Sequence, residues 1–198
     1  IDRSLVGSEM CIRDSSITSD VHETSQVDKL AEFLDVIQIP AFLCRQTDLI
    51  KSAAQTKKIV NVKKGQFLSH KEVSNIIKKI ENENNKKILI TERGNSFGYN
   101  YLINDFKGIH FMKEFGYPII FDSTHSVQLP GGLGKKSGGA REYVVPLSKA
   151  ASSLRIAGFF IETHPNPEKA LSDGPNMIYL HKMPKLLNTI NKINKAAK

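Results

Sequence analysis

The feature that most constrains the fold is a repeated alternation of short apolar runs with longer segments of helical pattern. Five apolar, β-branched runs begin 23, 29, 31 and 38 residues apart, at residues 35–42, 58–65, 87–94, 118–125 and 156–164. A weaker run, residues 16–23, precedes them. Near-continuous apolar strands that alternate with helices are typical of a parallel sheet covered by helices. The sequence therefore predicts an α/β fold.

Three segments between or after these runs have the spacing of amphipathic helices. Residues 69–84 place apolar side chains at helix spacing, with Ser69 as the expected N-cap and Glu72 three residues later. Residues 141–156 and 183–198 are the other two expected helices.

Six strand–helix units fit either an open doubly wound sheet or most of an eight-stranded barrel. Each run ends in polar, chemically capable side chains: Asp20 and His22; Gln38; Lys63; Glu92 and Arg93; Asp122 and His125; Glu162 and His164. A (β/α)8 barrel builds its site from the ends of many strands, whereas an open sheet concentrates its site at one switch point. We therefore predict a (β/α)8 TIM barrel with about six of its eight units present, strands 3–8, because such barrels usually need ~250 residues.

The first residues do not continue this pattern. Residues 1–15 lack a period and resemble a translated sequencing-adapter artefact, so we expect them to be a non-native segment. Residues 16–198 are then the partial TIM-barrel domain.

Composition argues against several classes of partner. The net charge of +8 could favour nucleic acid, but the lysines are scattered in pairs and aromatic residues are only 8% of the chain, so no stacking platform is expected. No run approaches the 18 apolar residues or so of a membrane span. Cys11 and Cys44 form neither a metal-type spacing nor a disulfide framework, which fits a reducing cytoplasm.

Two cations are candidates for binding an anion. Lys63 and Arg93 each follow a strand and stand near Gly65 and Gly94, which let a backbone approach a ligand. A lysine point charge and an arginine fork suit a phosphate or a carboxylate. The alternative is that both are solvated loop cations.

Three other residues are candidates for binding a metal ion. A nitrogen donor from His125 and oxygen donors from Glu162 and Asp173 suit Zn²⁺, Fe²⁺ or Mn²⁺ better than Ca²⁺. Three protein ligands with an open position are typical of a catalytic site. The alternatives are a structural, hydrogen-bonded histidine and acids that cap loops.

The glycine-rich run QLPGGLGKKSGG, residues 128–139, is too rich in glycine for a simple tight turn. We interpret it as a mobile loop that covers the site and excludes water, or else as a surface connection. It lacks the spacing of a P-loop.

Five segments together resemble one enzyme family. DVIQIPAFLCRQTDL, NVKKGQF, TERGNSFGYN, FDSTHSVQLPGG and IETHPNPEKALSDGP are similar to 3-deoxy-D-manno-octulosonate 8-phosphate synthase, over roughly residues 17–180. The resemblance implies a (β/α)8 barrel, usually a homotetramer. It also implies a transferase that condenses phosphoenolpyruvate with D-arabinose 5-phosphate and water in lipopolysaccharide synthesis. Heptulosonate-phosphate and sialic-acid-type synthases share the barrel and this chemistry, and they are the alternative.

The resemblance also implies roles for residues on the phosphoenolpyruvate side. Lys63 and Arg93 match the ligands of its phosphate, helped by the backbone near Ala41. Gln38 and Gln66 match polar residues that line the same pocket.

On the sugar and metal side, Asp20 matches a residue near the sugar phosphate, and Phe42 falls on a loop that reaches toward a neighbouring subunit's site. His125, Glu162 and Asp173 match three of the four ligands of the metal-dependent class, His125 and Asp173 being the expected catalytic pair. In the family the fourth ligand is a cysteine of the first strand.

That fourth ligand is not matched by either cysteine of this sequence. Cys11 lies in the foreign run, and Cys44 belongs to the FLCRQ loop, where we expect a structural role. The family's ligands for the pentose phosphate also belong to the missing units, so we expect the chain by itself to be catalytically incomplete.

Overall fold

The computed structural model describes residues 15–98, 100–130 and 138–197, and they divide into two compact units. Unit 1 comprises Ile1–Gly65 and Glu72–Ile90, and unit 2 comprises Gln66–Lys71 and Thr91–Lys198. Each unit is described by itself below. The predicted foreign segment, residues 1–15, lies outside the described residues except for Ser15.

Unit 1 is a sheet with the strand order β1-β2-β3-β4. Its strands are β1 (Thr18–Asp20), β2 (Val36–Ile39), β3 (Ile59–Lys63) and β4 (Ile88–Glu92), of which the last two residues belong to unit 2. The pairs β1–β2 and β2–β3 are parallel, in a register that puts Asp20 beside Gln38 and Gln38 beside Asn61. The carboxyl ends of these strands therefore form one row of polar side chains.

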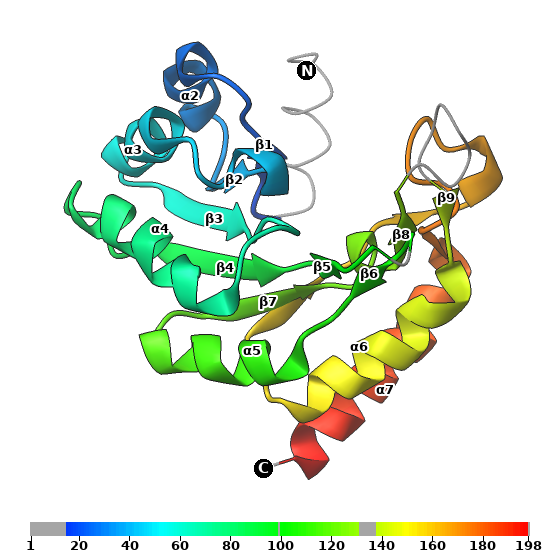
Figure 1. Cartoon of the computed structure of the whole chain (residues 1–198). Coiled ribbons are helices and arrows are strands. Elements are labelled where there is room, and N and C mark those ends of the chain that lie inside the picture. Colours follow the sequence, from blue (N-terminus) through cyan, green and yellow to red (C-terminus); the bar gives the residue numbers. More distant parts are fainter. Residues whose placement is uncertain (1–14, 99, 131–137, 198) are drawn as a thin grey trace. The chain divides into compact units, whose positions relative to one another are not determined.

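Three helices accompany this sheet: α2 (Thr24–Ala31), α3 (Thr47–Gln55) and α4 (Val73–Glu81), with a 3-10 turn, η1 (Ala41–Leu43), after β2. Because consecutive parallel strands are neighbours and crossovers are right-handed, successive helices fall on the same face, as Figure 1 shows for α2, α3 and α4. Helix α4 buries four apolar residues at i, i+3, i+4 and i+7: Val73, Ile76, Ile77 and Ile80.

The predicted N-cap of this helix is wrong. The helix begins at Val73 with Glu72 as its N-cap, because a separate 3-10 turn, η2 (His70–Glu72), precedes it. Ser69 lies before that tighter turn.

Unit 2 contains β7 (Ile119–Asp122) and β10 (Gly158–Phe160), paired in parallel with Asp122 beside Phe160. Its helices are α5 (Phe106–Met112), α6 (Val144–Ser153) and α7 (Met183–Ala196). Helices α6 and α7 lie side by side, and their apolar faces share one core cluster: Val127, Val144, Ile178, Leu186 and Ile190.

Short strand pairs and 3-10 turns carry the loops of unit 2. The pairs are β5 (Asn95–Ser96) with β6 (Leu102–Ile103), β8 (Gln128–Leu129) with β9 (Gly138–Gly139), and β11 (Thr163–His164) with β12 (Ile178–Tyr179). The turns are η3 (Lys113–Phe115), η4 (His125–Val127), η5 (Arg141–Tyr143), η6 (Pro167–Lys169) and η7 (Leu180–Lys182). The glycine-rich run is therefore a β8–β9 hairpin at its two ends, and its central residues 131–137 lie outside the described residues.

The α/β class is confirmed, since each of the six predicted runs contains at least one strand that is shorter than the run. The run 156–164 is divided between β10 and β11, which leaves Glu162 in the connection between them. Closure into a (β/α)8 barrel stays a prediction. Among the helices that the structure describes, none has the length and apolar character needed to cross a membrane.

Candidate metal centre and anion site

Three side chains of unit 2 come together as a candidate metal centre. His125, Glu162 and Asp173 each offer one ligand atom, and these atoms lie within 4.8 Å of one another. His125 begins η4, which follows β7 after two residues, Glu162 follows β10, and Asp173 lies in the loop after η6. Two of the three ligands thus come from the carboxyl ends of neighbouring parallel strands, as the sequence pattern predicted.

The imidazole of His125 is oriented by a buried carboxylate. Its Nδ1 lies 2.8 Å from Oδ2 of Asp122, which has no exposed surface. The other oxygen of Asp122 accepts hydrogen bonds from the backbone N–H groups of His125, at 2.8 Å, and Thr124, at 3.1 Å. Because a carboxylate only accepts, Nδ1 carries the proton and Nε2 keeps its lone pair for a ligand.

The spacing of two of the candidate ligands suits a shared ion. Nε2 of His125 lies 3.5 Å from Oε1 of Glu162. Two ligands at about 2.1 Å from a tetrahedral Zn²⁺ are separated by roughly 3.4 Å. The backbone of Glu162 is held in place, since its N–H donates to Oγ1 of Thr124 at 2.7 Å.

Asp173 occupies an unusual backbone conformation. Its φ is +52°, in the left-handed region that aspartate adopts more readily than most residues. Its carbonyl accepts from the N–H groups of Asn176, at 2.8 Å, and Met177, at 3.1 Å, while the carbonyl of Gly174 accepts from Nη2 of Arg141 at 2.6 Å. These bonds hold the turn that presents the carboxylate.

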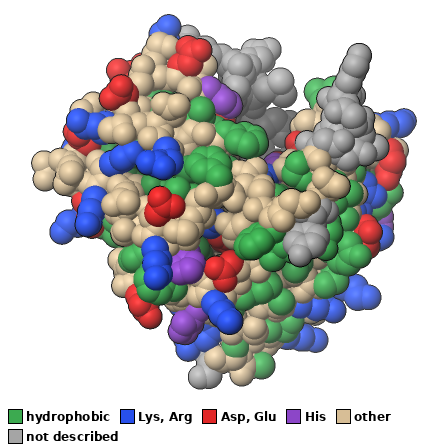
Figure 2. Space-filling model, in the orientation of Figure 1, with side chains coloured by type: hydrophobic (Ala, Val, Ile, Leu, Met, Phe, Trp, Pro, Cys, Tyr) green, Lys and Arg blue, Asp and Glu red, His purple; other side chains and the backbone are tan. Residues whose placement is uncertain are grey.

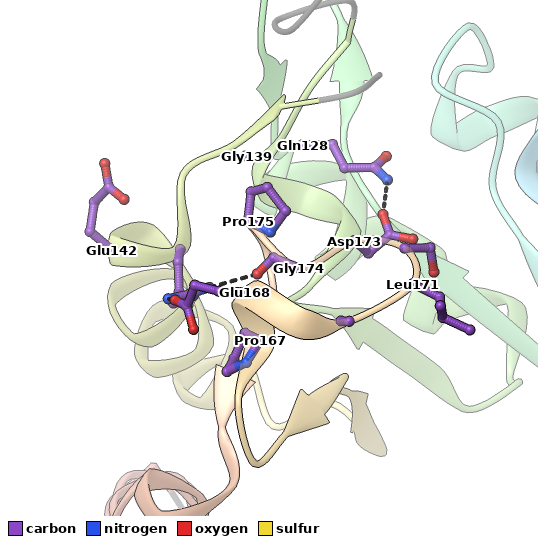
Figure 3. A pocket seen from close by; sticks show the side chains of 12 residues that line it. Gln128, Gly139, Glu142, Pro167, Glu168, Leu171, Asp173, Gly174 and Pro175 are labelled. Atoms are coloured by element: carbon purple, nitrogen blue, oxygen red, sulfur yellow. Dashed lines mark hydrogen bonds and ion pairs between the residues drawn. The ribbon is translucent and has the colours of Figure 1, made fainter. Parts of the chain in front are cut away.

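A pocket of about 910 Å³ lies beside this turn (Figure 3). Asp173 and Gln128 line one part of it and point toward one another, and the Nε2 of Gln128 donates to Oδ1 of Asp173 at 2.9 Å. Glu168 lines another part, where it accepts from Nη1 of Arg141 at 3.1 Å and from the hydroxyl of Tyr179. The hydrogen bond from Tyr179 lowers the pKa of Glu168 below its usual value.

Arg93 is the candidate anion ligand of unit 2. It follows β4 and is only 4% exposed. Its Nη2 donates to Oε1 of Gln128, whereas its Nη1 has no hydrogen-bond partner among the described residues. Burial lowers the pKa of Arg93, while the charges of Asp122, Glu92 and Asp173 raise it. A buried guanidinium with a donor to spare is suited to binding an anion.

The remaining residues of the predicted phosphate side are divided between the two units. Lys63 ends β3 in unit 1 and is buried, as is Lys64 beside it, whose Nζ donates to the carbonyl of Gly65 at 3.3 Å. Gln66 belongs to unit 2, where its buried Oε1 has no hydrogen-bond partner among the described residues. Because Lys63 and Arg93 belong to different units, a shared phosphate between them stays a prediction.

Asp20, which is predicted to lie near the sugar phosphate, belongs to a row of hydrogen-bonded side chains across three strands of unit 1. Nε2 of Gln38 donates to Oδ1 of Asp20 at 2.7 Å, and Nδ2 of Asn61 donates to Oε1 of Gln38 at 2.9 Å. Ala41 is buried in η1, and Phe42 next to it is 76% exposed. The exposed ring is consistent with a loop that reaches a partner, which stays a prediction.

Sequence reasoning gave no role to Asp122 and Gln128, the two residues that form hydrogen bonds with the candidate metal ligands His125 and Asp173. A signal for Asp122 was present, since an aspartate three residues before a histidine at a strand end commonly accepts the backbone N–H groups of the next turn. No short-range signal identifies Gln128, because it contacts residues 35 and 45 positions away in the sequence.

Lys and Arg side chains lie in several separate groups over the face drawn in Figure 2, and they do not gather into one basic patch there. The absence of a nucleic-acid partner stays a prediction.

The fold and the site together define an α/β protein with a histidine–carboxylate centre, linked through one glutamine to a buried arginine. Comparison with known proteins agrees: the sequence pattern of the DAHP synthetase I family matches residues 3–198, and the chain belongs to this family.

Individual relatives share one name, 2-dehydro-3-deoxyphosphooctonate aldolase. The protein of Pelobacter propionicus is 54% identical over 183 residues, covering 92% of this chain and 67% of the relative. The proteins of a Cyanothece and a Geobacter species are 52% and 53% identical, covering 91% and 90% of this chain and 66% and 65% of those relatives. The chain thus spans about two thirds of the length of the curated relatives it matches.

Proposed function

We propose that this chain belongs to an enzyme that condenses phosphoenolpyruvate with D-arabinose 5-phosphate and water, giving 3-deoxy-D-manno-octulosonate 8-phosphate and inorganic phosphate. The observation that carries the proposal is the His125, Glu162 and Asp173 cluster, joined through a hydrogen-bonded glutamine to Arg93. The octonate named in the relatives at 52–54% identity favours this product over a heptulosonate or a sialic acid.

The cations act on the phosphate of phosphoenolpyruvate. Arg93 binds it through Nη1, the donor without a partner among the described residues, and Lys63 adds a second positive charge. Binding at a fixed point orients C3 of the enol toward the aldehyde and lowers the entropic cost of bringing two substrates together. The new carbon–carbon bond joins C3 to the aldehyde carbon, water adds at C2, and the carbon–oxygen bond to phosphate breaks.

His125, Glu162 and Asp173 would hold a divalent ion, and Zn²⁺, Fe²⁺ and Mn²⁺ suit this donor set. Such an ion supplies Lewis acidity toward the sugar aldehyde or toward the water that attacks C2. Asp122 maintains the tautomer of His125 that has a lone pair on Nε2, so the site is prepared before the ion arrives.

Several wider features belong to the same proposal. They are a complete (β/α)8 barrel, a homotetramer in which Phe42 reaches a neighbouring site, and a cytoplasmic location. The chain alone is expected to turn over slowly or not at all, because further ligands belong to other strand–helix units of the family.

The assay measures release of inorganic phosphate from phosphoenolpyruvate with arabinose 5-phosphate or erythrose 4-phosphate as the acceptor. It uses this chain and a version extended by the N-terminal strand–helix units of a relative. We expect the extended protein to prefer arabinose 5-phosphate. A preference for erythrose 4-phosphate would contradict the proposal, and full turnover by the short chain would contradict its incompleteness.

Arg93→Met in the extended protein tests the anion site. Removing one partner of a buried charged contact costs about 2–5 kcal/mol, so kcat/KM for phosphoenolpyruvate should fall at least about 30-fold. The matched control is Arg155→Met, since Arg155 is exposed. Equal kcat/KM values in the two variants would show that Arg93 does not bind the phosphate of phosphoenolpyruvate.

A further inference from the structure

Both the oxygen and the nitrogen of the Gln128 carboxamide form hydrogen bonds with residues of the candidate sites. Its Oε1 accepts from Nη2 of Arg93, and its Nε2 donates to Oδ1 of Asp173 at 2.9 Å. The second contact is visible in Figure 3. One amide therefore connects the cation of the anion site to a carboxylate of the metal centre.

The direction of these two bonds requires a side chain that both accepts and donates, as a carboxamide does. A guanidinium can only donate and a carboxylate can only accept, so the bridging group must accept on one side and donate on the other. A glutamate would place a second negative charge against Asp173, and an asparagine is one methylene shorter. A chain of hydrogen bonds between a cation and an anion is also polarised in one sense, which strengthens each bond.

The backbone of Gln128 is fixed, so the bridge has a rigid base. Gln128 pairs with Gly139 in the β8–β9 hairpin, and its N–H donates to the carbonyl of His125. The N–H of Ala140 donates to the carbonyl of Val127 at 3.1 Å. These bonds tie the residue to η4, which carries the metal-ligating histidine.

Arg93 can bind an anion without breaking the bridge. Nη2 donates to Gln128, and Nη1 is the donor that has no partner within the described part of the chain. An anion on Nη1 would fix the guanidinium plane, and the fixed plane would restrain the carboxamide of Gln128 and, through it, the carboxylate of Asp173.

We propose that Gln128 is a positioning residue that couples the two sites, so that an anion bound at Arg93 raises the affinity of the His125, Glu162 and Asp173 centre for a divalent ion. By linkage the ion raises the affinity for the anion by the same factor. The physical cause is a shared ordering cost: the first ligand immobilises the bridge, and the second binds without immobilising it again. The proposal rests on the metal and anion sites of the proposed function.

The test measures Co²⁺ affinity by competition with a chromogenic chelator, with and without inorganic phosphate, in the full chain. We expect phosphate to tighten Co²⁺ binding about 5- to 20-fold in the unchanged protein, which lies in the lower part of the usual range of coupling between sites. In Gln128→Met, which keeps length but loses both hydrogen bonds, the ratio should fall to about 2-fold or less. The absorption spectrum of bound Co²⁺ should change as well, since Asp173 loses its amide donor.

Gln55→Met is the matched control. Nε2 of Gln55 donates to Oε2 of Glu83 at 2.9 Å in unit 1, so this variant removes the same kind of contact outside the site. Its coupling ratio should equal that of the unchanged protein. If Gln128→Met does not fold by circular dichroism, Gln128→Asn replaces it, because the shorter amide cannot contact both partners and should also lose coupling.

The outcomes separate this proposal from the one on which it rests. A ratio that persists in the Gln128 variant would mean that phosphate and metal attract each other directly, and the bridge would be refuted while the two sites stand. Co²⁺ binding that is insensitive to phosphate in the unchanged protein would also refute the coupling alone. An unchanged protein that binds no Co²⁺ would refute the metal centre, and the bridge with it.

Discussion

Asp122→Asn replaces one carboxylate oxygen by an NH₂ group of nearly the same size, and it changes which nitrogen of His125 can carry the proton. Asp122 accepts hydrogen bonds from Nδ1 of His125 and from two backbone N–H groups in the same turn. If the new NH₂ faces the ring, it donates to Nδ1, and Nε2 then carries the proton and cannot bind a metal ion. If the NH₂ faces the backbone, it points at the N–H groups of Thr124 and His125, which are donors too, and neither bond can form. The first orientation keeps these contacts but moves the proton of His125, and the second loses contacts, at a side chain with no exposure to water.

The magnitudes follow from these contacts. In both orientations the groups bonded to Asp122 lose a charged acceptor. A hydrogen bond to a charged group contributes about 1.5–3 kcal/mol and a neutral one about 0.5–1.5 kcal/mol, so we expect the free energy of unfolding to fall by about 2–4 kcal/mol. Loss of the carboxylate behind a metal-ligating histidine weakens metal binding about 10- to 100-fold, which corresponds to about 1.4–2.7 kcal/mol.

The assay combines Co²⁺ or Zn²⁺ competition with urea unfolding of the metal-free protein. Asp105→Asn is the control, because Asp105 also pairs with a histidine, His70, at 3.1 Å and also accepts a backbone N–H, from Gly108 at 2.8 Å. We expect that control to lower stability without changing metal affinity. Metal affinity that is equal in Asp122→Asn and the unchanged protein would refute the tautomer argument.

Three further predictions concern stability. Burial raises the pKa of Cys44 above its ordinary value of 9.0, so the protonated thiol stabilises the fold below pH 9.0 and this contribution is lost as the pH rises further. Cys44→Ala should therefore flatten the decline of the free energy of unfolding above pH 9.0, and an unchanged slope would contradict this. Gly139→Ala would put a Cβ 1.7 Å from Oδ1 of Asn176, and calorimetry should show a lower Tm from a loss of about 1–3 kcal/mol; an unchanged Tm would mean that the loop moves freely. Leu186→Ala, in the core of unit 2, should cost about 2–5 kcal/mol in urea, far more than Leu187→Ala beside it, which is 47% exposed.

The strand–helix alternation could be predicted from the sequence because it depends on local periodicity. The run at 58–65 contains β3, buried after its first residue, and the apolar spacing of 69–84 marks the buried face of α4. Element ends were less certain, since they depend on hydrogen bonds between neighbouring turns. The 3-10 turn His70–Glu72 moved the start of α4 past the expected cap at Ser69.

The candidate ligands were likewise evident from residue type and position at strand ends. His125 and Glu162 follow neighbouring strands, and the parallel pairing of β7 and β10 brings such ends together in any sheet. The chemistry of the donors, nitrogen with carboxylate oxygen, was therefore a property of the sequence alone.

Only the tertiary structure decided how these groups act on one another. Asp173 reaches the cluster through a left-handed turn, and Gln128 joins it to an arginine 35 residues earlier than the glutamine. Such contacts depend on how loops pack in three dimensions, and no periodicity in the chain encodes them. The sequence by itself determined an α/β chain with candidate metal-binding and anion-binding side chains at strand ends. The folded loops determined which nitrogen of His125 faces Asp122, which donor of Arg93 is left for an anion, and which amide lies between the two candidate sites.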